Sequence, residues 1–144
     1  MKHLLRLLLV LTLGLLILSA YKIADAPDVK INNVQKELID LIFNGTGKIL
    51  KGIVESPIEY TNEEYACGVI SLPDNVDERE IINYTYELIN IVDSVIVQTT
   101  AWNRITLDDN TAIRSDYKIL HVNVQFLYIK TNDRNDLLFI VSNL

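Results

Sequence analysis

The sequence predicts an α+β domain, a two-layer sandwich of two helices on a mainly antiparallel sheet, preceded by an N-terminal transmembrane helix. Three observations lead to this prediction. An apolar run from Leu4 to Tyr21 opens the chain, two later stretches repeat apolar residues at helical spacing, and from Ser94 onward the spacing changes to the alternation of β-strands. Residues 31–144 are therefore expected to form one exterior domain.

Residues 1–22 are expected to form a signal-anchor, a membrane helix that is not removed. The eighteen residues from Leu4 to Tyr21 cover about 27 Å as a helix, close to the hydrocarbon thickness of a thin bilayer. Lys2 and Arg6 lie at the start of the run and Lys22 directly after it, where long cations reach lipid headgroups. Because the very short leader carries cations and no acid, we expect a cytoplasmic N-terminus and an exterior domain.

A cleaved signal peptide and a buried helix of a soluble protein remain open as alternatives. Met1 to Leu18 has the basic start and apolar core of a signal peptide. Cleavage after Ala20 would place Leu18 at the minus-three position, and cleavage after Ala24 would place Lys22 there. Neither is the small residue that signal peptidase prefers, so the pattern favours the anchor.

Composition limits the partners and the means of stabilisation. The net charge of −6 disfavours nucleic-acid phosphates as the partner of the exterior domain. The only cysteine, Cys67, excludes an intrachain disulfide, so a hydrophobic core must stabilise the fold. Cys67 itself is expected to be a buried thiol, with an interchain disulfide as the alternative.

Two helices follow the anchor. Residues 23–30, with their proline, are expected to form a stalk. From Ile31 to Phe43 apolar residues recur at helical spacing, and Asn44–Gly47 is expected to end this helix in a turn. Asp77, followed three residues later by Glu80, has the form of a helix cap and predicts a second helix from about Glu78 to Val92.

The remaining apolar stretches are expected to be strands. Lys48–Glu55 is ambiguous, but its Ile and Val content favours a strand, and Tyr65–Leu72 is a second short run. Val95–Trp102 alternates weakly and Tyr117–Lys130 clearly, so we expect these two and Leu137–Val141 to form an antiparallel meander.

No catalytic, cofactor-binding or metal-binding residue emerges from the sequence, and we expect a protein that is not an enzyme. His121, on the polar side of the predicted strand Tyr117–Lys130, is interpreted as a structural residue. The acidic stretches at 108–110 and 133–136 are typical of turns. Gly45-Thr46-Gly47-Lys48 lacks the spacing of a phosphate-binding loop.

Three further positions have two interpretations each. Trp102, next to Asn103 and Arg104, either closes the edge of the core or anchors an interface. Asn44 and Asn83 each begin an Asn-X-Thr sequon. Asn44 is expected in a turn, whereas Asn83 falls within the second helix and must point outward to be modified.

In outline, such a domain on a membrane anchor resembles the cystatin-like and NTF2-like periplasmic or lumenal modules of assembly complexes. The layout of the whole chain also resembles the per os infectivity factors of large insect DNA viruses, particularly the 19-kDa-like member. The resemblance lies in the anchor with its lysine (Leu4 to Lys22) and the Thr100–Ile105 strand in an Asn- and Ile-rich ectodomain.

This resemblance implies a subunit of an entry complex in the virion envelope, with other membrane proteins as partners and lipid contacted through Leu4 to Tyr21. It assigns no functional residue. The competing hypothesis is a secreted, periplasmic or lumenal domain with a cleaved signal, acting as a ligand-binding module, an assembly factor or an enzyme.

Overall fold

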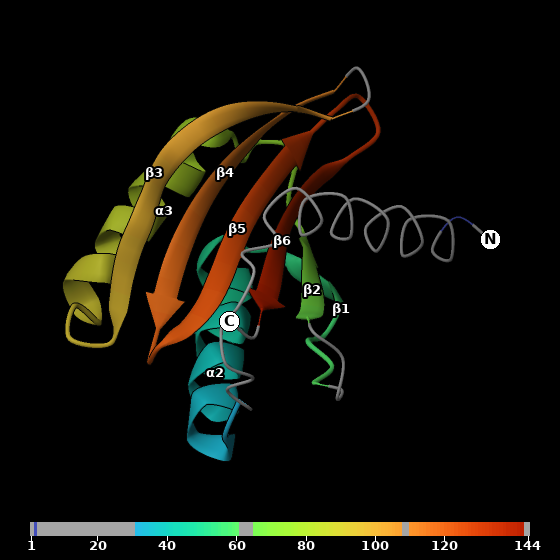
Figure 1. Ribbon diagram of the computed structural model, residues 1–144. Coiled ribbons are helices and arrows are strands. Elements are labelled where there is room, and N and C mark those ends of the chain that lie inside the picture. Colours follow the sequence, from blue (N-terminus) through green and yellow to red (C-terminus); the bar gives the residue numbers. More distant parts are fainter. Residues whose placement is uncertain (1, 3–30, 61–64, 108–109, 143–144) are drawn as a thin grey trace.

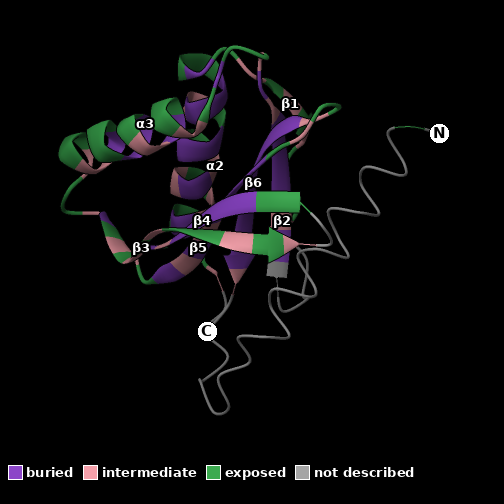
Figure 2. Cartoon of the chain, turned by 90° about the horizontal axis from the view of Figure 1, so that it is seen from above, coloured by how far each residue is buried: buried purple, intermediate pink, exposed green. Residues whose placement is uncertain are grey.

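The computed structural model describes residue 2 and residues 31–60, 65–107 and 110–142. Six strands form one antiparallel sheet in the order β1-β2-β6-β5-β4-β3. Helices α2 and α3 both lie on one face of this sheet, behind it in Figure 1 and above it in Figure 2. The elements are α2 (Asn33–Ile49), β1 (Ile53–Ser56), β2 (Tyr65–Ser71), α3 (Glu78–Ile91), β3 (Ile96–Leu107), β4 (Asn110–Ile119), β5 (Val122–Lys130) and β6 (Asn135–Ser142).

The α+β class with two helices and an antiparallel sheet is confirmed. Within the described ranges, no helix combines the length and the apolar character needed to cross a bilayer. The expected anchor, Leu4 to Tyr21, and the stalk lie outside the described residues.

Helix α2 begins as a capped helix and ends later than the sequence suggested. The side chain of Asn32 accepts from the backbone N–H of Gln35, and the Gln35 side chain accepts from the N–H of Asn32, which makes a capping box. The expected stop at Asn44–Gly47 is wrong, because α2 continues to Ile49. Thr46 is fully buried in this last part of the helix, where its hydroxyl donates to the carbonyl of Ile42 and bonds the hydroxyl of Tyr84.

The end of α2 is a Schellman motif. The N–H of Gly52 donates to the carbonyl of Gly47 and that of Lys51 to the carbonyl of Lys48, while Lys51 adopts a φ of 56°. The predicted strand Lys48–Glu55 is therefore wrong for its first half, since Lys48 and Ile49 belong to the helix. Strand β1 begins only at Ile53.

The predictions for β2 and α3 are confirmed. Strand β2 spans Tyr65–Ser71, and α3 spans Glu78–Ile91 with Asp77 as its N-cap, whose carboxylate accepts from the N–H of Glu80. The buried side of α3 is made by Ile81, Tyr84, Thr85 and Leu88, which recur at helical spacing.

The predicted single strand Tyr117–Lys130 is two strands. Strand β4 ends at Ile119, a turn at Leu120 and His121 reverses the chain, and β5 begins at Val122. Both turn residues have positive φ, 48° and 69°, as a two-residue hairpin turn requires. The sequence did not reveal this turn because it lacks the Asn and Gly that favour such backbone angles. Strands β3 to β6 then form a four-stranded meander.

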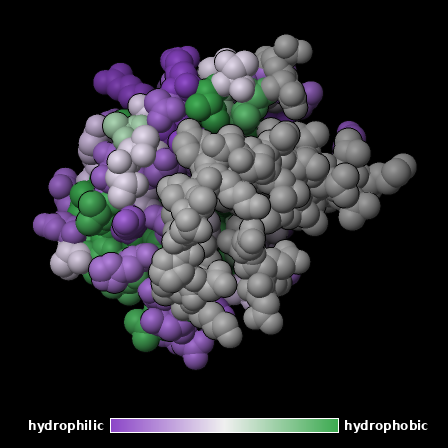
Figure 3. Space-filling model, in the orientation of Figure 1, coloured by the Kyte–Doolittle hydropathy of each residue, from purple (hydrophilic) through white to green (hydrophobic). Residues whose placement is uncertain are grey.

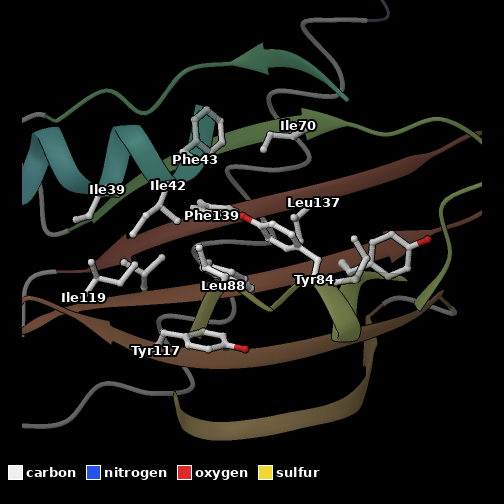
Figure 4. Packing of buried hydrophobic residues seen from close by; sticks show 14 of the residues in the cluster. Ile39, Ile42, Phe43, Ile70, Tyr84, Leu88, Tyr117, Ile119, Leu137 and Phe139 are labelled. Atoms are coloured by element: carbon white, nitrogen blue, oxygen red, sulfur yellow. The ribbon is translucent and has the colours of Figure 1, made fainter. Parts of the chain in front are cut away.

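The main core fills the space between the helices and the sheet (Figure 4). Three rings form its centre: Phe43 packs edge-on against Phe139 at 5.2 Å, and Phe139 stacks on Phe126 at 4.2 Å between ring centroids. Gly68 permits this packing, because a Cβ there would lie 2.6 Å from Ile58 and 2.8 Å from the Phe43 ring.

Candidate functional site

The face of the sheet that points away from α2 and α3 carries a second apolar cluster, which is the most distinctive surface of the domain. We call this side of the sheet the outer face. Its apolar cluster, the outer patch, contains only strand residues from β2, β4, β5 and β6: Val69, Ala112, Leu127, Ile129, Leu138 and Ile140. Ile105, Leu107 and Cys67 lie partly buried against it.

Strand register places these side chains next to one another. Leu138 is the antiparallel partner of both Val69 in β2 and Leu127 in β5, so one row of aliphatic side chains crosses three strands. Ile129 pairs with Ala112, which in turn pairs with Ile105, and a second row forms beside the first. Because alternate residues face opposite sides of a strand, the outer patch is contiguous.

The outer patch is more deeply buried than its position in the fold explains. An antiparallel sheet with helices on one side normally presents a polar face to water. Here every outer-patch residue is at most 3% exposed, and Leu127 and Leu138 are fully buried. Yet α2 and α3, the described helices, both lie on the opposite face (Figure 2).

Polar groups that are buried or partly buried border the outer patch. Arg114 forms an ion pair with Asp116 at 3.2 Å, and Gln125 donates to the other oxygen of that carboxylate at 3.0 Å. At another border Arg134 pairs with Asp136 at 3.1 Å, where the Asp136 side chain is 2% exposed. Such pairing is needed because an unpaired buried charge is strongly unfavourable.

Two polar atoms at this border lack a partner among the described residues. They are Oε1 of Gln125 and Nη2 of Arg134, and both are inaccessible to solvent. Native proteins leave few such atoms unsatisfied. Together with the aliphatic rows, they distinguish the outer face from the polar sheet face that is usual in a two-layer domain.

Cys67 lies at the edge of the outer patch, where its surroundings do not favour the thiolate form. It is a free, half-buried thiol whose strand partner is Ile140. Burial raises the pKa of Cys67 to about 12, whereas reactive cysteines have a lowered pKa. The interpretation as a structural thiol is thus favoured by its surroundings.

A shallow, open pocket near the N-terminus of α3 is the other candidate. It is lined by Asp77, Glu78, Arg79, Ile82, Asn83 and Lys130. Its charged groups already have neighbours, since Lys130 donates to the carbonyls of Asp74 and Val76 and Glu78 pairs with Arg104 at 3.0 Å. In the described ranges, no group of three or more His, Cys, Asp or Glu side chains could hold a metal ion.

The residues singled out in the sequence do not converge on one site. His121 lies exposed in the β4–β5 turn, and not on the polar face of a strand as expected. Trp102 packs against the main core and donates to the hydroxyl of Thr85 at 2.9 Å, which favours the core-edge interpretation. Asn83 points outward as its sequon requires, whereas Asn44 lies within α2 and not in a turn.

The outer patch was missed in the sequence, although a signal for it was present. Phe126–Ile129 and Leu137–Val141 are uninterrupted apolar runs, typical of strands that are buried on both faces. The alternation within Tyr117–Lys130 indicates only the face that packs on the helices. The exposed large apolar residues elsewhere are Val34, Leu41, Ile49, Ile53, Tyr86, Ile91 and Val97. Among the coloured residues on the one face that Figure 3 draws, hydrophobic and hydrophilic residues lie side by side.

No protein-family model matches the chain, and no curated protein matches it with significance. The fold and its surface chemistry define an α+β domain with one helix-covered and one further apolar sheet face.

Proposed function

We propose that the protein is a single-pass, membrane-anchored, non-enzymatic subunit of a multi-subunit membrane complex. Residues 4–21 are the anchor, the N-terminus lies on the cytoplasmic or internal side, and the α+β domain stands outside the bilayer. The outer face is the surface through which the anchored domain meets the other membrane proteins of the complex. The resemblance to per os infectivity factors leads us to propose the virion envelope of a large insect DNA virus as the setting.

The single observation that carries this proposal is the outer patch. A two-layer domain needs one apolar sheet face, and a second one marks a surface made for contact. The aliphatic rows of the patch present no group that could act on a substrate. The raised pKa of the half-buried Cys67 thiol and the paired charges near α3 likewise support a binding role over a chemical one.

The test separates anchoring from assembly. The full-length chain is expressed in its host membrane, washed with alkaline carbonate and then purified in mild detergent. We expect it to stay in the membrane pellet and to co-purify with other membrane proteins. The proposal fails if the intact chain enters the aqueous phase, and a mature N-terminus near Tyr21 would instead support the secreted, cleaved-signal alternative.

A substitution of the outer face tests the assembly surface directly. We expect Leu138→Ser to reduce co-purification while the chain stays in the membrane. The matched control is Leu41→Ser, an aliphatic residue of α2 that is 69% exposed, and it should leave co-purification unchanged. Equal loss in both variants would show that the outer face is not the contact surface.

A further inference from the structure

We propose that β3 is the contact surface for a second copy of this chain, so that two domains join edge to edge into one continuous antiparallel sheet. This inference goes beyond the proposed function and does not rest on it. It concerns a different surface, the edge of β3, and leaves the outer patch available to other partners. The partner is a second copy because β3 is complementary to another β3 that runs in the opposite direction.

The first argument concerns the two edges of the sheet, which in the described part of the chain are β1 and β3. Strand β1 is protected against pairing with another strand. It has only 4 residues and a register irregularity, it contains the charged Glu55, and Pro57 follows it directly. Natural proteins commonly protect edge strands in these ways. Strand β3 is therefore the edge at which another strand can be added.

Strand β3 is long and lacks most of these protections. Its 12 residues, IVQTTAWNRITL, contain neither proline nor lysine, and six of them are β-branched, which favours a strand. Its single charged residue, Arg104, is paired with Glu78 of α3 at 3.0 Å. The register irregularities of β3 against β4 lie between Gln98 and Asn103. Residues 96–98 and 103–107, on either side of them, keep the regular geometry that an added strand needs.

The second argument is that β3 is self-complementary. In an antiparallel pair of β3 strands with Ala101 opposite Ala101, Val97 lies opposite Ile105. In the same register Thr99 lies opposite Asn103. Aliphatic side chains then face aliphatic ones and polar side chains face polar ones, and such cross-strand pairs stabilise a sheet. All of them lie on the outer face, because Ile105 packs against the outer patch and alternate residues share a face.

The side of β3 that faces the helices fits the same register. Trp102 lies opposite Thr100 of the second copy, and Arg104 lies opposite Gln98. Each cation therefore faces a neutral amide, and repulsion between the two copies of Arg104 is avoided.

Neighbouring registers match less well. With the centre one residue earlier, Val97 would lie opposite Asn103. With the centre one residue later, Thr99 would lie opposite Ile105. The register centred on Ala101 is the one of these three that pairs like with like on the outer face.

The third argument is an apolar stripe on α3 beside the β3 edge. Helix α3 lies behind β3 in Figure 1, and its residues Glu78 and Thr85 contact that strand. Tyr84, on another side of the helix, bonds Thr46 of α2. Helical spacing places the stripe on the side of Glu78 and Thr85, away from α2. The stripe consists of Ile82, Tyr86 and Ile89.

Pairing of two β3 edges brings the two stripes together. The two-fold axis of such a pair is perpendicular to the sheet, so both copies carry their helices on the same side. Tyr86 is 56% exposed and Val97 57% exposed, and both lose exposed apolar area when the second copy binds. Backbone hydrogen bonds along β3 and apolar contacts between the α3 helices thus stabilise the same dimer.

Disulfide formation tests the register in the full-length chain, purified in mild detergent and oxidised in air with copper phenanthroline. We expect Ala101→Cys to form a linked dimer, because opposite Cα atoms of antiparallel strands lie about 4.5 to 5.5 Å apart, within the range of a disulfide. Thr99→Cys alone and Asn103→Cys alone should not, because each lies about 13 Å along the strand from its own copy. These two variants should link to each other when they are co-expressed. Every variant keeps Cys67, so the unsubstituted chain is the control for links through that thiol.

Sedimentation equilibrium of the full-length chain in detergent measures the affinity of the dimer. Ala101→Arg places two cations opposite each other at the centre of the pair and should weaken the dimer more than about tenfold. Leu41→Arg adds the same cation at a 69% exposed position of α2, and it should leave the affinity unchanged.

A second pair of variants tests the stripe on α3. Tyr86→Ser should weaken the dimer about threefold or more, because it removes apolar area that the dimer buries. Ile91→Ser is the matched control, since Ile91 is 76% exposed and lies on the side of α3 that carries Tyr84. Equal effects of the two variants would show that the stripe is not part of the contact.

Several outcomes would overturn the inference. They are a monomer at every concentration tested, a dimer that Ala101→Arg leaves intact, and a Thr99→Cys variant that links to itself as efficiently as Ala101→Cys does. If Ala101→Cys links to a different protein in the host membrane, the β3 edge binds another chain and the inference is wrong. Circular dichroism checks the fold of Ala101→Arg, and the disulfide pattern decides the question even if that variant does not fold.

The results also separate this inference from the proposed function. A monomeric chain that co-purifies with other membrane proteins would refute the dimer and support the membrane role. A chain that forms the predicted disulfides but is released by alkaline carbonate would support the dimer and refute the anchor.

Discussion

The side-chain amide of Gln35 donates a hydrogen bond of 2.7 Å to the backbone carbonyl of Leu120, 85 residues further along the chain. This contact joins the first turn of α2 to the hairpin turn between β4 and β5. The N–H of Leu120 donates in turn to the carbonyl of Val95, so the turn is held from two sides. Both bonds fix a turn whose residues, Leu120 and His121, have unfavourable positive φ angles.

We expect Gln35→Ala to destabilise the domain by about 1 to 3 kcal/mol. The substitution removes the bond to Leu120 and half of the capping box with Asn32, and leaves a part-buried carbonyl without its donor. Urea denaturation followed by circular dichroism measures the change. The control Glu37→Ala, at an exposed position of the same helix, should stay within about 0.5 kcal/mol. Equal effects of the two variants would show that the contact does not stabilise the turn.

Lys51→Gly should stabilise the protein by about 0.5 to 1 kcal/mol. Lys51 occupies the left-handed position of the Schellman motif with a φ of 56°, where glycine avoids the steric cost of a Cβ. The same change at Lys48, inside α2, should instead destabilise by about 1 kcal/mol because glycine is a poor helix former. Thermal unfolding of both variants checks the opposite signs, and a shift of the same sign in both would contradict the argument.

Tyr128 gives the domain a sensitivity to alkaline pH. Its hydroxyl donates to the carbonyl of Val76 and bonds Oδ1 of Asn135 at 2.6 Å, in a side chain that is 1% exposed. Burial raises the pKa of Tyr128 above its usual value of 10, and nearby carboxylates raise it further: Asp77, Glu78 and Glu80.

Because the pKa of Tyr128 is higher in the folded state, its stabilising contribution is complete below pH 10 and is lost as the pH rises above that value. We expect the unfolding free energy of the unsubstituted protein to fall between pH 10 and 11. Tyr128→Phe should reduce that slope by up to about 1.4 kcal/mol per pH unit, the effect of one proton. Urea titrations at several pH values measure it, and an unchanged slope in Tyr128→Phe would show that another group controls the loss.

Glycosylation tests the orientation that the proposed anchor implies. Asn44 and Asn83 are both exposed on the helix layer, away from the outer patch. In a eukaryotic secretory membrane, a translocated domain should carry N-linked glycan. This glycan is measured as the mass that glycosidase treatment removes, and Asn83→Gln should reduce that mass. Asn90→Gln, an exposed α3 asparagine outside a sequon, should leave it unchanged. A membrane-bound chain without any such mass would place the domain on the cytoplasmic side.

Sequence patterns predicted those helices and strands whose signals, such as a helix cap or an apolar period, lie within a few neighbouring residues. The Asp77 cap and the helical spacing of the apolar residues after it predicted α3, because a cap and a 3.6-residue period are both local. The length of α2 was not predictable in this way. Its last turn, with Gly45 and Gly47, is stabilised by the burial of Thr46 against Tyr84, a residue of another helix.

By itself the sequence determined the class of the domain, the helix-facing side of the sheet and the presence of an apolar segment before the domain, since each depends on composition or periodicity. The tertiary structure decided where α2 ends, how Leu120 and His121 reverse the chain, and that the row from Val69 through Leu138 to Leu127 forms a second buried face. The physical reason is that the periodicity of apolar residues predicts which side chains lie on the same face of a helix or strand. Only contacts between distant segments decide whether that face is covered.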